Sequence, residues 1–210
     1  MWNIFYEDAR LALQFASFLE VVFADDLNAF RPFPLNAPNK VVIRTAEECQ
    51  QELHKWGRAN QVQFDPGKES LHVISHHCPA GSNFNILGLS FDCRLIMQDA
   101  ISGLTSEMRW PVRSVLRTQR YHTTASTIQL YKSNIVSYCE CRTAAIDHAC
   151  ASLLQHVDRV RDSFLKEIGI DDVTAFSVFN LAPLPLRRDI AMLGLIHRTT
   201  LGHGPPHFQK

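Results

Sequence analysis

The chain has 210 residues, 46% of them hydrophobic and 20% charged, and its 21 basic and 21 acidic residues leave no net charge. This composition is typical of one globular domain or two small ones, and it excludes extensive disorder and a uniformly basic nucleic-acid-binding surface. No run of about 20 apolar residues is present, so we expect neither a transmembrane helix nor a membrane partner. The N-terminus lacks the pattern of a signal peptide, so the six cysteines are expected to be reduced in an intracellular protein, nuclear or cytoplasmic.

The first half of the sequence alternates strand-like segments with turns. Residues 2–18 have the apolar spacing of a helix, and two apolar runs at 21–24 and 27–30 predict a β-hairpin. Asp25 and Asp26 stand at or beside its turn. The other elements expected in this half are a helix from a capping-box pattern at 45–48 to Gly57, strands at 61–64, 70–74 and 84–91, and a turn at 65–68.

After about residue 95, the apolar residues recur at helical spacing. The helices expected there are 111–120, 124–137, 145–168 and 187–199. The change in pattern predicts an α+β fold in two parts, residues 1–95 and 96–210.

Asp25 and Asp26 are the most informative residues of the sequence, because charged side chains rarely interrupt an apolar strand. An unpaired buried carboxylate costs several kcal/mol, whereas Mg²⁺ binds carboxylates, water and substrate phosphates. Two such ions about 4 Å apart can activate an attacking oxygen and stabilise a leaving oxygen in phosphoryl transfer. The alternative is an ordinary solvent-exposed turn, in which aspartate is common; the dipeptide alone favours this alternative.

The residues around this pair resemble a known family. Phe23-Ala24-Asp25-Asp26 is similar to the catalytic Phe/Tyr-x-Asp-Asp box of reverse transcriptases, in the form found in LINE-type (non-LTR) retrotransposon enzymes. Three further segments occur in the family's order: residues 2–9 resemble the helix before the box, 56–70 a helix that runs into a hairpin with a lysine, and 84–92 the primer-grip block. The resemblance covers nearly the whole chain.

The resemblance implies that residues 1–95 are the C-terminal part of a polymerase palm, made of antiparallel hairpins with packed helices. Residues 96–210 would be an all-α thumb with a C-terminal extension. It also implies that Asp25 binds metal with the assistance of Asp26, and that Lys68 faces the phosphates of an incoming deoxynucleoside triphosphate. A solvated turn lysine is the alternative for Lys68.

Leu87 and Gly88 match the part of the family that places the 3′ end of the primer, where a glycine allows close backbone approach. Two family features have no counterpart in the sequence. One is the Gln-Gly template-contacting motif, and the other is the aspartate of an earlier palm strand, for which Asp8, on an expected helix, is a poor substitute. The family's fingers have no counterpart either. We therefore expect that this polypeptide by itself does not polymerise.

Arg113, Arg117 and Arg120 lie at i, i+4 and i+7, which predicts a basic face on one helix. Between Arg109 and Arg142 the only acid is Glu140. Such a face binds phosphates irrespective of base sequence, as expected of a thumb helix beside a duplex. The alternative is an ordinary solvated helix face.

Together these features favour part of an RNA-directed DNA polymerase that uses two Mg²⁺ ions, an RNA template, a DNA primer and deoxynucleoside triphosphates. Two alternatives stay open at this point. One is a non-catalytic remnant that binds nucleic acid through the arginines, and the other is a structural α+β protein in which the acidic pair only forms a turn.

Overall fold

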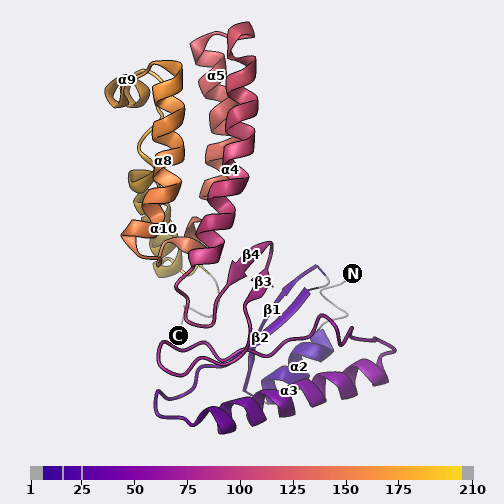
Figure 1. The fold of residues 1–210 in the computed structure, drawn as a ribbon. Coiled ribbons are helices and arrows are strands. Elements are labelled where there is room, and N and C mark those ends of the chain that lie inside the picture. Colours follow the sequence, from indigo (N-terminus) through magenta and orange to yellow (C-terminus); the bar gives the residue numbers. More distant parts are fainter. Residues whose placement is uncertain (1–6, 16, 25, 205–210) are drawn as a thin grey trace. The chain divides into compact units, whose positions relative to one another are not determined.

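The computed structural model describes residues 7–15, 17–24 and 26–204 (Figure 1). The fold is α+β, because helices are combined with two small antiparallel hairpins. The chain divides into two compact units, Met1–Phe84 and Asn85–Lys210, which are described separately below. The proposed domain boundary at residue 95 stays a prediction. None of the described helices is long and apolar enough to cross a membrane.

The first unit contains the predicted hairpin. Its elements are α2 (Glu7–Phe15), β1 (Leu19–Phe23), β2 (Asp26–Phe30) and α3 (Asn39–Ala59). The strands pair antiparallel from Leu19↔Phe30 to Phe23↔Asp26, and the valines and phenylalanine of β1 suit a pleated strand. α2 packs against α3. One apolar cluster that packs these elements together consists of Leu13, Phe18 and Cys49, with Leu27, Ala46 and Leu53 packed against them.

Helix α3 begins six residues before the capping-box pattern, so the predicted start at residue 45 is wrong. Thr45 lies inside the helix, where its hydroxyl donates to the Val41 carbonyl oxygen at 2.9 Å instead of capping a new helix. At the other end, a Cβ added to Gly57 would lie 2.8 Å from the Val62 oxygen and 2.9 Å from a Phe64 ring carbon. The glycine therefore lets the chain fold back closely over the helix.

Two strands predicted after α3 do not form. Residues 61–64 are irregular because Val62 and Phe64 pack on Trp56, and residues 70–74 contribute only the isolated bridge between Val73 and Ala80. The predicted turn between them is confirmed. In this turn the Lys68 amide donates to the Asp65 carbonyl oxygen at 3.0 Å, and the Gly67 amide donates to the Asp65 side chain at 2.9 Å.

Residues 84–91 form a second hairpin and not the single strand predicted. β3 (Phe84–Ile86) pairs with β4 (Leu89–Phe91). Leu87 and Gly88, which join them, both have positive φ, at 50° and 78°. Positive φ at both central residues is what a two-residue hairpin turn of type I′ requires. The sequence did not predict this turn, because Leu87 and Gly88 lie within an apolar run typical of a single strand.

The second unit is otherwise helical (Figure 1). Its elements are α4 (Gln98–Thr118), the 3₁₀ turn η1 (Gln119–Tyr121), α5 (Thr124–Tyr131), the π-helical segment η2 (Lys132–Val136), α6 (Ser137–Glu140), α7 (Thr143–Ile146), α8 (Ala151–Ile168), α9 (Asp172–Ser177) and α10 (Leu184–Thr200). α4 packs along α8. The predicted helix at 145–168 is wrong as one helix. The chain forms α7 and α8 instead, and Cys150, just before α8, has extended backbone geometry.

Helix α4 also differs from its prediction, because Pro111 lies in its interior and not in its first turn. Proline has no N–H to donate to the carbonyl of Glu107, which normally weakens a helix. The residues of α4 that are buried lie along one face and hold the helix on both sides of the proline. They are Ala100, Ile101, Leu104, Thr105, Met108, Val112 and Val115. This packing outweighs the proline's effect, so the helix continues through it.

Two buried arginines fasten the later helices to α8. Arg188 of α10 is 6% exposed and makes a two-pronged ion pair with Asp158 of α8, with nitrogen–oxygen distances of 2.7 and 3.1 Å. Arg161 of α8 donates to Asp172 at 2.6 Å and to the Leu181 carbonyl oxygen at 3.1 Å. A buried charge without a partner is costly, so these pairs determine where α9 and α10 attach.

Replacing Arg188 by alanine should lower the free energy of unfolding by about 3 kcal/mol, because the substitution leaves Asp158 without its partner in a largely desolvated site. Urea unfolding of the whole chain, followed by helical circular dichroism, measures this loss. Arg187→Ala is the matched control. Arg187 pairs with Glu140, both being more exposed than the Arg188–Asp158 pair, and its loss should cost about 1 kcal/mol or less. Equal losses of unfolding free energy in the two variants would contradict the greater contribution assigned to the buried Arg188–Asp158 pair.

Candidate nucleic-acid interface

The first candidate feature is the acidic end of the β1–β2 hairpin. Asp26 is the first residue of β2, is exposed, and pairs with Phe23 at the end of the ladder next to the turn. Asp25 lies outside the described residues. The neighbouring apolar side chains Val21 and Phe23 are 44% and 61% exposed. The described acid thus stands at one end of an apolar, solvent-facing ribbon.

The described residues do not fit a complete magnesium site. Among residues 7–15, 17–24 and 26–204 no group of three histidine, cysteine or acidic side chains is placed to hold a metal ion. Asp26 is the one expected ligand that these ranges include. A magnesium site at Asp25 and Asp26 therefore stays a prediction, and we derive no catalytic step through a metal ion.

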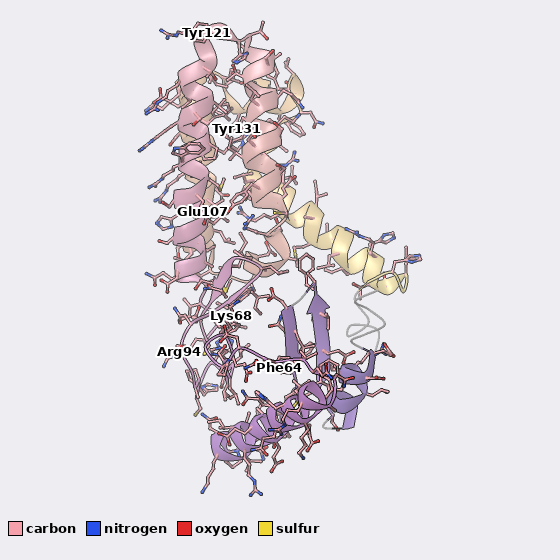
Figure 2. The ribbon with its side chains drawn as sticks, turned by 90° about the vertical axis from the view of Figure 1, so that its right-hand side faces the viewer. Phe64, Lys68, Arg94, Glu107, Tyr121 and Tyr131 are labelled. Carbon is pink, nitrogen blue, oxygen red and sulfur yellow. The ribbon has the colours of Figure 1, made fainter. Side chains whose placement is uncertain are left out.

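Lys68 is exposed at the end of its turn (Figure 2). The next residue, Glu69, accepts hydrogen bonds from Gln50 and from His54, with a nitrogen–oxygen distance of 2.9 Å to His54. These contacts hold the turn against α3 and give the Lys68 backbone a defined position. The role proposed for Lys68 at nucleotide phosphates stays a prediction.

Leu87 and Gly88 occupy the turn of the β3–β4 hairpin. The Leu87 side chain is 58% exposed, and a Cβ added to Gly88 would meet no atom within 4 Å. Gly88 is therefore favoured by the backbone conformation of the turn and not by a close neighbour within this chain. The space beside Gly88 is open to a ligand, and its proposed contact with a primer stays a prediction.

Asp92 joins this hairpin to α4. Its carboxylate accepts backbone N–H bonds from Arg94 at 3.0 Å, Ile96 at 3.1 Å and Met97 at 2.7 Å. Partial burial would raise the pKa of Asp92, but these N–H groups outweigh it and hold the pKa below its usual range. Asp92 therefore sets the path by which the chain enters α4.

The arginines predicted to bind phosphate divide between two elements. Arg113 and Arg117 are exposed on α4, whereas Arg120 belongs to η1, after the helix has ended. The single helical face predicted for all three is therefore wrong for Arg120. The Arg120 guanidinium lies 4.7 Å from the centre of the Tyr121 ring, at the tip of the α4–α5 pair (Figure 2).

Two other cations of this stretch are used inside the protein. Lys132 donates to the Phe179 carbonyl oxygen at 3.0 Å, and Arg142 donates to the Tyr138 carbonyl oxygen at 3.2 Å. In contrast, within the part of the chain that the structure describes, no ion pair forms at four exposed arginines. These are Arg109, Arg113, Arg117 and Arg120. They are available to an external anion.

Sequence reasoning did not single out the aromatic residues that accompany these arginines. Trp110 is 74% exposed on α4, three residues before Arg113, and Tyr121 is 71% exposed in η1. The spacing of Trp110 to Arg113 and Arg117 was visible in the sequence as i, i+3 and i+7. Its significance depends on the direction of the buried face of α4, which only the structure defines. A surface depression lies beside η1 and is lined by Leu116, Arg117, Gln119, Arg120, His122 and Thr124.

Comparison of the chain with family models, with curated protein sequences and with solved structures finds no match.

Asp92→Asn should lower the free energy of unfolding by about 1 kcal/mol at pH 7, because an amide oxygen is a weaker acceptor than a carboxylate for three N–H groups. The pKa of Asp92 is lower in the folded chain than its usual value. The stabilisation that the Asp92 carboxylate gives to the fold is therefore fully present above the usual carboxyl pKa and is lost as the pH falls below about 4. Urea unfolding at pH 7 and pH 3 should show the difference between wild type and variant shrinking with acid; a constant difference would refute the assignment.

Proposed function

We propose that this chain is the palm-to-thumb portion of a LINE-type reverse transcriptase, an RNA-directed DNA polymerase, and that its helical unit binds the phosphates of an RNA template and a DNA primer. The observation that carries the proposal is the exposed arginine set of α4 and η1, which forms no ion pair within residues 7–15, 17–24 and 26–204. In the same unit, Arg161, Arg187 and Arg188 all have carboxylate partners. Arg109, Arg113 and Arg117 differ from these because they are exposed and follow one another along a single helix, where they can meet an external anion together.

Electrostatics supports an anionic ligand for this group. Arg109, Arg113 and Arg117 follow one another at intervals of four residues on one helix, and like charges at this spacing repel by a few tenths of a kcal/mol per pair. No acid on the helix is paired with them among the described residues: Glu107 instead accepts a hydrogen bond from the Tyr138 hydroxyl. Phosphates along a nucleic-acid strand would remove this repulsion and release counterions.

The hairpin of the first unit supports the polymerase assignment. In its register Asp26 lies next to the turn of the two-stranded ribbon, and the resemblance implies that Asp26 is the second acid of the catalytic box. The reaction proposed is attack of a primer 3′-hydroxyl on the α-phosphate of a deoxynucleoside triphosphate, with pyrophosphate as the leaving group. Because the aspartate of the earlier palm strand and the fingers of the resembled family have no counterpart in this sequence, we propose that this polypeptide alone is inactive.

A non-catalytic nucleic-acid-binding protein is the second candidate. The same arginines favour it, and it requires no metal site. The two candidates differ at the acidic pair, which contributes to polymerisation only when further carboxylates complete the site. The third candidate, a structural α+β protein, requires neither nucleic-acid binding nor nucleotide incorporation.

The double variant Arg113→Ala/Arg117→Ala should bind an RNA–DNA duplex roughly tenfold more weakly than wild type, because it removes two phosphate contacts. The slope of log affinity against log salt should also fall by about two. Fluorescence anisotropy with a labelled duplex at several salt concentrations measures both quantities. Arg159→Ala is the matched control, because Arg159 is an exposed arginine of α8 that forms no ion pair among the described residues. A double variant that binds like wild type would reject the arginine surface.

A primer-extension assay with the purified chain, Mg²⁺, a primed RNA template and deoxynucleoside triphosphates should show binding without incorporation. The expected reason is that the aspartate of the earlier palm strand, which completes the metal site in the resembled family, has no counterpart in this sequence. Asp26→Asn should leave duplex binding unchanged, because Asp26 is not part of the arginine surface. Robust incorporation that Asp26→Asn abolishes would overturn the inactivity of the isolated chain and establish the polymerase. Absence of both binding and incorporation would leave the structural candidate.

A further inference from the structure

We propose that the outward face of α4 and the adjoining η1 turn bind single-stranded nucleic acid, with Trp110 and Tyr121 as surfaces on which unpaired bases stack. This inference rests on the proposed nucleic-acid function, because it uses the same arginines, but it specifies a ligand form that the function does not. The residues that carry it are Trp110, Arg113, Arg117, Arg120 and Tyr121.

Trp110 lies on the side of α4 away from the protein core. The buried residues of α4 repeat at helical spacing on the opposite side, among them Leu104, Met108 and Val115. Trp110, Arg113 and Arg117 are separated by three and four residues, so their side chains are neighbours along one stripe. With 74% of its surface exposed, the indole contributes little to core packing.

Isolated apolar side chains on a surface are common and need no special role. Trp110 differs because the next charged residues along the stripe, Arg113 and Arg117, form no ion pair among the described residues. Glu107, one turn before Trp110, accepts a hydrogen bond from the Tyr138 hydroxyl. A cationic groove or stripe that follows a backbone, interleaved with exposed aromatic rings, is the arrangement used by proteins that bind single strands. Arginine would contact the phosphates while the indole would stack on a base.

Tyr121 provides a second ring at the far end of the stripe. It is 71% exposed, and the Arg120 guanidinium lies 4.7 Å from its ring centre, which keeps a cation beside an aromatic face. Eleven residues separate Trp110 from Tyr121, which corresponds to about 16 Å along a helix axis. At about 3.4 Å per nucleotide of a stacked strand, this length accommodates roughly five nucleotides.

The aromatic rings distinguish a single strand from a duplex. In a duplex the base faces are stacked on one another, and exposing one costs a few kcal/mol. A duplex would therefore use only the arginines and leave both rings without a function. An unpaired strand offers phosphates and base faces together, so it matches the whole set of exposed groups. An acidic polypeptide could pair with the arginines, but it has no base faces to stack on Trp110 and Tyr121.

Trp110→Ala and Tyr121→Ala should each weaken binding of a labelled 20-nucleotide single strand of uridine about tenfold, and up to a hundredfold for Trp110. Binding of a 20-base-pair RNA–DNA duplex and of an abasic strand of the same charge should change less than about twofold, because neither presents a free base face. The salt dependence should be unchanged, since no charge is removed. Anisotropy titrations with the full chain measure these quantities.

Phe176→Ala is the matched control, because Phe176 is an aromatic residue 52% exposed on α9, and it should affect no ligand. Urea unfolding checks that each variant retains wild-type stability, as expected for exposed positions. The inference would be overturned if the Trp110→Ala variant bound the single strand as tightly as wild type. It would also be overturned if this variant lost affinity for the single strand and for the duplex equally. Polyglutamate binding as tightly as the uridine strand would overturn it too.

The double variant Arg113→Ala/Arg117→Ala separates this inference from the proposed function. If it weakens binding of both single strand and duplex while Trp110→Ala weakens neither, nucleic-acid binding holds and the stacking surface is rejected. If the arginine variant leaves both ligands bound as tightly as before, the proposed function and the inference fail together.

Discussion

The apolar contact between α4 and α8 is the interaction on which the helical unit depends. Ile101, Leu104 and Met108 of α4 are at most 2% exposed, and on the neighbouring helices Tyr131 stacks on Phe164 with ring centres 4.0 Å apart. Burying a large apolar side chain contributes roughly 1.5–3 kcal/mol, so a few such residues outweigh the weakness that proline causes within α4. This packing defines which side of α4 faces solvent and therefore where its arginines and its tryptophan lie.

The arginines of the helical unit fall into two groups with different roles. Arg161 and Arg188 are buried and paired, because a guanidinium without a partner in a desolvated site is strongly unfavourable. Arg113 and Arg117 are exposed to solvent, where a guanidinium without an ion-pair partner costs little. The difference in burial, and not the residue type, decides which arginines hold helices together and which can meet an external phosphate.

The first unit depends on a smaller cluster. Leu13, Phe18 and Cys49 are buried between α2, α3 and the hairpin, while Val21, Phe23 and Phe30 on the strands are at least 42% exposed. An isolated two-stranded hairpin is marginally stable in water, and both of its outer edges carry backbone groups without a strand partner in the described part of the chain. This hairpin therefore presents an apolar surface whose acidic end includes Asp26.

Local patterns in the sequence were sufficient for the β1–β2 hairpin, the turn at 65–68 and the buried stripe of α8 that includes Val157, Val160 and Phe164, because each depends on neighbouring residues and on a clear period. They were insufficient where packing overrides propensity. Pro111 stays inside α4, and Leu87–Gly88 turns within an apolar run. The sequence by itself identified the cationic residues, but only the tertiary structure decided which are paired and that Trp110 shares their face, because burial depends on contacts between helices far apart in the chain.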